Sequence, residues 1–152
     1  MAEDPHPERK RKMSKVAVVY WSGTGNTAKM ADAVAEGAKG AGAEAEVIEC
    51  SSFSSANVSE YDTIAFGCPA MGAEVLEEAE FDPMFTELEG TLQGKKIGLF
   101  GSWGWGGGAW MTDWEERCKN DGAVLLMPGV MCQDTPDDAA LEECRALGAA
   151  LA

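Results

Sequence analysis

The stretch YWSGTGNTAKM (residues 20–30) places two glycines, two threonines and a serine between an apolar run and a helix-like segment. The run before the loop, KVAVVYW, has the β-branched content of a short buried strand. The segment after it, TAKMADAVAEGAKGAG, spaces apolar side chains along one helical face, namely Met30, Val34 and Ala38. A glycine-rich turn between a strand and a helix N-terminus is typical of loops that bind phosphate. The stretch therefore predicts an α/β domain with a phosphate site.

The alternation of strand and helix patterns continues along the chain. Further strands are predicted in AEAEVIEC (43–50), DTIAFG (62–67), residues 96–101 and AVLLMPGVM (123–131), the last broken by Pro128 and Gly129. Helices are predicted in EEAEFDPMFTEL (77–88), AWMTDWEERCKNDG (109–122) and DDAALEECRALGAALA (137–152). Five strands alternating with helices predict an open, doubly wound parallel α/β sheet with helices on both faces.

Ligands of such sheets bind beyond the carboxyl ends of the strands, near the point where the strand order reverses. Three predicted loops leave these ends, at residues 22–27, 68–78 and 102–109. All three are unusual in composition, so we expect them to form one site.

The first loop is compared with two common nucleotide-binding loops. A triphosphate-binding loop needs a lysine directly before its serine or threonine, whereas Asn26 precedes Thr27 here, which excludes that class. A dinucleotide loop matches the glycine spacing of GTGNTA (23–28), and Glu49 ends the second strand where a ribose-binding acid belongs. However, 152 residues leave no room for a second, substrate-binding domain.

The hydroxyl groups of the loop favour a terminal phosphate monoester, which exposes three oxygens and needs many donors. Ser22, Thr24 and Thr27 supply hydroxyls, and the backbone N–H groups at the helix N-terminus carry partial positive charge. The alternative without a ligand is a plain turn in which Asn26 or Thr27 caps the helix.

The other two loops offer groups that suit a flat ring. Met71 lies at a loop tip, where a thioether packs well on a π-system. Trp103 and Trp105 stand among five glycines, where an indole is better placed over a planar ligand than in a core. The alternative is that these two tryptophans only cover the end of the sheet, while Trp110 and Trp114, at helical spacing, belong to the core. A flat ring with a phosphate tail describes flavin mononucleotide (FMN).

From about residue 16 to residue 151, the chain resembles the short-chain flavodoxins of anaerobic bacteria, most closely in VYWSGTGNT, GCPAMG and GLFGSWGWG. This resemblance implies the flavodoxin-like fold, with five strands in the order 2-1-3-4-5. It also implies which residues contact FMN: Ser22, Gly23, Thr24, Gly25, Asn26 and Thr27 at the phosphate, and Pro69, Ala70, Met71, Gly72, Ala73, Glu74, Ser102, Trp103, Gly104 and Trp105 around the ring. Two departures bear on the redox potential: relatives usually have tyrosine at the position of Trp103 and a polar residue or glycine at that of Ala73.

The function that the resemblance implies is low-potential one-electron transfer. FMN would cycle between semiquinone and hydroquinone, and the protein would replace ferredoxin without turning over a substrate of its own. The first alternative is an FMN-dependent NAD(P)H quinone or nitro reductase on the same fold, which would need a nicotinamide site over the flavin. A phospho-receiver is the second alternative, but it would need an acidic pair where the first strand ends in YWSG.

The charge of the chain is uneven. Residues 1–13 carry four basic side chains, whereas residues 14–152 hold eight basic and 23 acidic ones, a net charge of −15. Such a field repels nucleic acid and anionic membranes and favours redox partners with basic docking faces, although acidity also simply maintains solubility. We expect a monomer.

The N-terminal segment differs from the rest of the chain. Residues 1–13 lack periodicity and are predicted to be a disordered basic tail, or alternatively a basic interaction arm, before a domain at 14–152. No apolar run approaches the roughly 18 residues of a membrane span, and no signal-peptide segment follows the basic start, so we expect a cytoplasmic location.

The five cysteines form no CxxC pair and the only histidine is His6, which predicts reduced thiols, no metal site and no histidine-based triad.

Overall fold

The computed structural model describes residues 14–23, 25–71, 75–104 and 108–152. The predicted tail at 1–13 lies outside these residues, as do Thr24, Gly72, Ala73, Glu74 and Trp105. The strands are β1 (Lys15–Tyr20), β2 (Glu44–Glu49), β3 (Thr63–Gly67), β4 (Lys96–Trp103), β5 (Val124–Leu125) and β6 (Val130–Gln133). The helices are α2 (Asn26–Gly40), α3 (Ser55–Val58), α4 (Phe81–Leu88), α5 (Ala109–Asn120) and α6 (Asp138–Leu151), with short 3₁₀ turns η1 (Cys50–Ser52) and η2 (Glu89–Thr91).

The sheet confirms the expected topology. Its order is β2-β1-β3-β4-β5, and every pair of strands in it is parallel. The order reverses at β1, between β2 and β3, so the carboxyl ends of β1 and β3 open at the switch point where ligands of such sheets bind.

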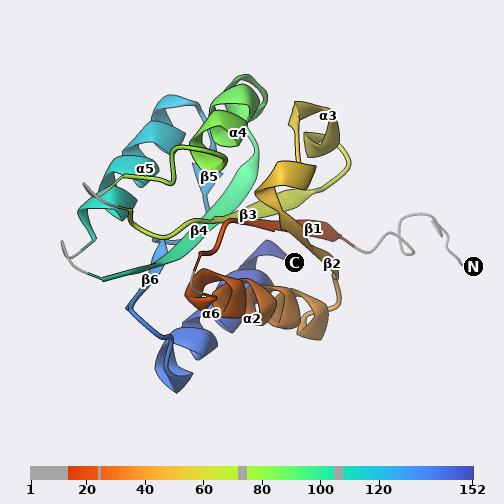
Figure 1. The fold of residues 1–152 in the computed structure, drawn as a ribbon. Helices are drawn as coiled ribbons and strands as arrows, with labels where there is room; N and C mark the ends of the chain where they lie inside the picture. Colours follow the sequence, from red (N-terminus) through yellow and green to blue (C-terminus); the bar gives the residue numbers. More distant parts are fainter. Residues whose placement is uncertain (1–13, 24, 72–74, 105–107) are drawn as a thin grey trace, which may run out of the picture.

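The fifth strand is divided into two segments that both pair with β4 (Figure 1). β5 pairs with the start of β4, and β6 pairs with its end, from Phe100 opposite Val130 onward. The break falls at Pro128 and Gly129, as predicted. Proline has no N–H for the ladder, and the N–H of Gly129 donates instead to Oε2 of Glu115 at 2.7 Å.

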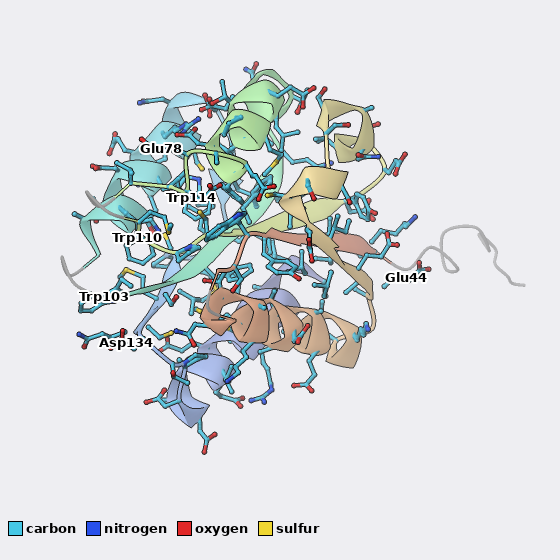
Figure 2. All side chains as sticks on the ribbon, viewed as in Figure 1. Glu44, Glu78, Trp103, Trp110, Trp114 and Asp134 are labelled. Atoms are coloured by element: carbon cyan, nitrogen blue, oxygen red, sulfur yellow. The ribbon has the colours of Figure 1, made fainter. Side chains whose placement is uncertain are left out.

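Helices cover both faces of the sheet (Figure 1), and each face has its own core. On one face α4 and α5 bury aromatic side chains, including Phe81, Phe85 and Trp114. On the other face α2 and α6 pack together, and the predicted stripe of α2 is fully buried there. Trp110 is also buried, so the expectation that it and Trp114 belong to the core is confirmed (Figure 2).

One boundary departs from the prediction and changes the site. β4 runs to Trp103, two residues beyond the predicted end at 101, because Ser102 and Trp103 pair with Cys132 and Gln133 of β6. Ser102 and Trp103 therefore lie at the end of a strand, and the expectation that they belong to a loop was wrong. A strand end has fixed backbone hydrogen bonds, so it places these two side chains more firmly than a loop would.

Candidate functional site

The predicted phosphate loop leads directly into a helix N-terminus. α2 begins at Asn26, and the residue before it, Gly25, has the left-handed backbone conformation (φ 96°) that glycine adopts without steric cost. The Oγ of Ser22 accepts a hydrogen bond from the N–H of Gly25 at 3.0 Å, which closes the turn. The oxygen of Ser22 thus shapes the loop.

In the alternative of a plain capping turn, the named cap residue was wrong, because it is neither Asn26 nor Thr27. Asn26 and Thr27 lie inside the helix, the N-cap residue is Gly25, which has no side chain, and the first turn holds no acidic residue. The first turn of α2 therefore directs N–H groups outward with no carboxylate in that turn to compete for them. Such a terminus attracts an anion.

Thr27 connects this helix to β4. Its side chain is buried (1% exposed), and its Oγ1 lies 3.3 Å from the Oγ of Ser102. Two hydroxyls from distant parts of the chain thus meet beneath the loop.

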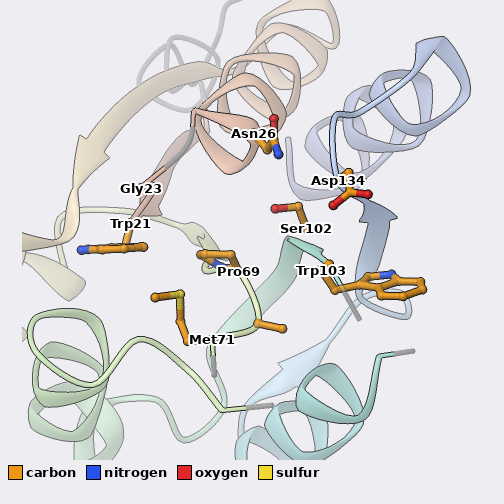
Figure 3. A pocket seen from close by; sticks show the side chains of 10 residues that line it. Trp21, Gly23, Asn26, Pro69, Met71, Ser102, Trp103 and Asp134 are labelled. Carbon is orange, nitrogen blue, oxygen red and sulfur yellow. The ribbon is translucent and has the colours of Figure 1, made fainter. Parts of the chain in front are cut away.

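A pocket of about 230 Å³ opens at the carboxyl ends of β1, β3 and β4 (Figure 3). Eight of the residues that line it were predicted for the site: Gly23, Asn26, Pro69, Ala70, Met71, Ser102, Trp103 and Gly104. Apolar and aromatic side chains form much of its wall, which suits a flat ring. Ser22 and Gly25 face a neighbouring, polar pocket of about 210 Å³ instead, and Thr27 lines neither pocket.

Two lining residues, Trp21 and Asp134, were missed by the sequence prediction. Trp21 was taken as the last residue of the first strand, but β1 ends at Tyr20 and Trp21 begins the loop. Its indole Nε1–H donates to Oε1 of Glu80 at 2.8 Å, and its ring lies 3.0 Å from where a Cβ on Gly23 would stand. A larger residue at position 23 would therefore press on the Trp21 ring. The position of Trp21 between the first strand and the phosphate loop was the signal that could have found this residue.

Met71, in the second predicted loop, is paired with Val75. These two residues exchange two backbone hydrogen bonds, of 2.9 and 3.2 Å, and therefore lie side by side. The N–H of Ala70 donates to the carbonyl of Ser102 at 3.0 Å and ties the start of this loop to β4. The second and third predicted loops are therefore brought together, as expected.

A buried carboxylate holds the far end of the same loop. Glu77 is only 6% exposed, and its two oxygens accept N–H groups from Ala79, Glu80 and Phe81 at 2.8–2.9 Å. Burial by itself would raise the pKa of Glu77, but these three hydrogen bonds outweigh it and the pKa is lowered. Glu77 is therefore an anion that fixes the approach to α4.

The thiols behave as expected from the sequence. All five cysteines are free, and four are buried. Burial raises the pKa of Cys118 and Cys144 to about 12 and that of Cys50 to about 11, so these thiols stay protonated. Within the part of the chain that the structure describes, no group of three or more His, Cys, Asp or Glu side chains could hold a metal ion.

The described features fit FMN. A helix N-terminus that begins after a glycine and has no acidic residue in its first turn suits a phosphate, and the adjoining apolar pocket with Met71 and two indoles suits an aromatic ring. The left-handed backbone at Gly25 and the close approach of Trp21 to Gly23 both disfavour larger residues beside that phosphate position. Fold and site together define an α/β domain of the type that binds a nucleotide phosphate at its switch point.

Comparison with known proteins agrees with this description. The flavodoxin family model matches residues 18–148. The flavodoxin of Megasphaera elsdenii is 44% identical over 137 residues, which are 90% of this chain and 98% of that one. The flavodoxin of Clostridium beijerinckii is 43% identical over 135 residues, covering 89% and 97%.

Solved structures agree as well. The solution structure of two-electron reduced Megasphaera elsdenii flavodoxin matches with a TM-score of 0.83, covering 90% of this chain and 97% of that chain. Oxidised flavodoxin 1 of Bacillus cereus, 28% identical, matches with a TM-score of 0.77 over 91% and 97%. The chain therefore belongs to the flavodoxin family, the FMN-binding electron carriers, and the expected fold, cofactor and class of function are confirmed.

Proposed function

We propose that this chain holds FMN with its phosphate at the N-terminus of α2 and its ring in the pocket beside Met71 and Trp103, and carries single electrons at low potential. The observation that carries the proposal is the N-terminus of α2, which has glycine as its N-cap and no acidic residue in its first turn and lies beside that apolar pocket. When bound, FMN supplies the ability to accept and release electrons one at a time. The residues of the chain bind it, orient it and exclude water from it.

The phosphate end is assigned to backbone donors and hydroxyls. Gly25 turns the chain so that the N–H groups of the first helical turn point to the ligand. Ser22 closes the turn with its oxygen, and we assign its hydroxyl proton as a donor to the phosphate. Thr24 and Asn26 complete the proposed phosphate contacts, with Thr24 assigned from the family motif alone.

The ring end is assigned to three segments. Met71 comes from the second loop, Trp103 from the end of β4, and Trp21 adds an indole from the first loop. Gly72, Ala73, Glu74 and Trp105 are assigned to the ring on the family motif alone. Because Ala70 is hydrogen-bonded to the carbonyl of Ser102, the two ring-side segments would hold their separation whether or not FMN is bound.

The charge of the domain supports a low potential and a basic partner. Residues 14–152 carry a net charge of −15, which opposes the addition of a further negative charge to the bound cofactor. The same field attracts redox proteins with basic docking faces and repels nucleic acid. We infer a monomer that works in the cytoplasm and takes the place of ferredoxin. Among the described residues, no helix has the length and apolar character to cross a membrane.

The test is a stepwise reduction of the purified protein, reconstituted with FMN, while the visible spectrum is recorded. The proposal expects stoichiometric FMN binding and two resolved one-electron steps. Reduction in a single two-electron step, together with rapid NADPH oxidation by the protein alone, would establish the reductase alternative. Failure to bind FMN at all would refute the proposed site.

A further inference from the structure

The chain makes an unusual turn where β6 ends beside the pocket. Asp134 has φ 55°, and it is the only residue other than glycine with positive φ in the described part of the chain. Residues with a Cβ avoid this left-handed conformation, and aspartate is among the few that adopt it with some frequency. Such a conformation persists only where the surrounding structure requires it, and it often marks a functional position.

The side chain of Asp134 does not explain the conformation. The residue is exposed, and no hydrogen bond or ion pair within the described segments involves its carboxylate. Oδ1 lies 3.7 Å from where a Cβ on Gly104 would stand, so the carboxylate stays beside the end of β4 without bonding to it. We therefore look to the backbone of the turn, and not to the carboxylate of Asp134, for the contacts that hold this conformation.

The backbone of the turn holds the end of β4. The N–H of Asp134 donates to the carbonyl of Trp103 at 2.8 Å, one residue beyond the last paired position of β6. The neighbouring Gln133 donates from Nε2 to the carbonyl of Gly104 at 3.4 Å. On the other side, the thiol of Cys132 lies 3.7 Å from the carbonyl of Asp134. The turn thus fastens two consecutive residues, Trp103 and Gly104, that line the pocket.

We propose that Asp134 is a positioning residue for the cofactor: its left-handed turn fixes Trp103 and Gly104 as a rigid wall of the pocket before FMN binds. Figure 3 shows Asp134 beside Ser102 and Trp103 at this wall. The inference rests on the proposed FMN site. A residue that disfavours positive φ would strain the turn that carries the hydrogen bond to the Trp103 carbonyl. The wall would then be less ordered in the free protein, and ordering it on binding would lower the affinity for FMN.

The test compares substitutions that differ in their tolerance of positive φ. Asp134→Val, which is β-branched and strongly disfavours this conformation, is expected to weaken FMN binding about tenfold. Asp134→Asn removes the charge but tolerates the turn, and Asp134→Gly removes the side chain and tolerates it best. Both are expected to bind FMN within about twofold of the wild type.

Gly42 offers a matched control for strain. It has φ 97° in the turn between α2 and β2, at the opposite end of the sheet, with open space where a Cβ would stand. Gly42→Val should therefore lower the thermal midpoint as Asp134→Val does, yet leave FMN affinity unchanged. If Asp134→Val does not fold, Asp134→Ala replaces it, with Gly42→Ala as its control.

The outcomes separate the inference from the proposed function. If Asp134→Val binds FMN like the wild type, or if Asp134→Asn loses affinity as Asp134→Val does, the turn has no positioning role. If Gly42→Val loses affinity equally, the effect is one of general stability, and the inference is wrong. If the wild-type protein itself does not bind FMN, the proposed function has failed instead.

Discussion

The hydroxyl oxygens of Thr27 and Ser102 lie 3.3 Å apart and join the first turn of α2 to the end of β4. Both side chains are almost fully buried, at 1% and 5% exposed. A buried hydroxyl that loses its partner costs more than the hydrogen bond contributes while it is intact. This pair therefore connects the phosphate loop to the ring wall through a contact that the fold cannot easily lose.

Thr27→Val should destabilise the protein, because it removes one hydroxyl of this pair and leaves Ser102 without its partner. The free energy of unfolding should fall by about 1–3 kcal/mol. Urea denaturation of the FMN-free protein measures this change. Thr112→Val, an exposed position on α5, is the control and should change stability by less than about 0.5 kcal/mol. Equal effects of the two substitutions would show that the Thr27–Ser102 contact contributes nothing.

Gly25→Ala should weaken FMN binding more than riboflavin binding. The added Cβ strains a backbone at φ 96°, at a cost of about 1–2 kcal/mol, and in the proposed site only the phosphate of FMN depends on this turn. Fluorescence titration of both ligands measures the difference, expected to be about tenfold. Gly42→Ala introduces the same strain at φ 97° away from the pocket and should spare both ligands. Equal weakening of FMN and riboflavin by Gly25→Ala would place the phosphate elsewhere.

Glu77→Gln should lower stability near neutral pH and reduce the sensitivity to acid. The pKa of Glu77 is lowered in the folded protein, so its contribution is complete above the unfolded pKa of about 4.3 and is lost as the pH falls through the folded pKa. Replacing an anion that accepts three N–H groups should cost about 1–3 kcal/mol at neutral pH.

Urea denaturation at several pH values measures this effect. The gap between the wild type and Glu77→Gln should narrow steadily as the pH falls below about 4.3. Glu78→Gln, at the exposed neighbouring position, should leave stability unchanged throughout. A gap that stays constant with pH would mean that the charge of Glu77 has no role in stability.

Deletion of residues 1–12 should leave FMN affinity and the thermal midpoint unchanged, because the composition of this segment predicts a tail that does not pack on the domain. FMN titration and thermal unfolding of the shortened and full-length proteins provide the comparison. A clear loss of either property would show that the tail is part of the folded unit or of the site.

The sequence by itself determined the alternation of strands and helices and the position of the phosphate loop. These features depend on neighbours along the chain: β-branched runs form strands, and a glycine-rich turn precedes the apolar stripe of α2. The residues from Gly23 to Thr27 could therefore be placed at a helix N-terminus from the local pattern alone. The break at Pro128 and Gly129 was equally local, since proline cannot continue a strand ladder.

Only the tertiary structure decided which residues from other segments complete the pocket. Asp134 lies beside Trp103 because β6 pairs with β4 in one register, and no local pattern around Asp134 specifies that register. The same pairing extends β4 to Trp103, whereas the flanking glycines had predicted a loop. Trp21 lines the pocket, and its indole donates a hydrogen bond to Glu80, 59 residues away. Hydrogen bonds and strand pairings between distant segments form only when the chain folds, so they leave no periodic signal in the sequence.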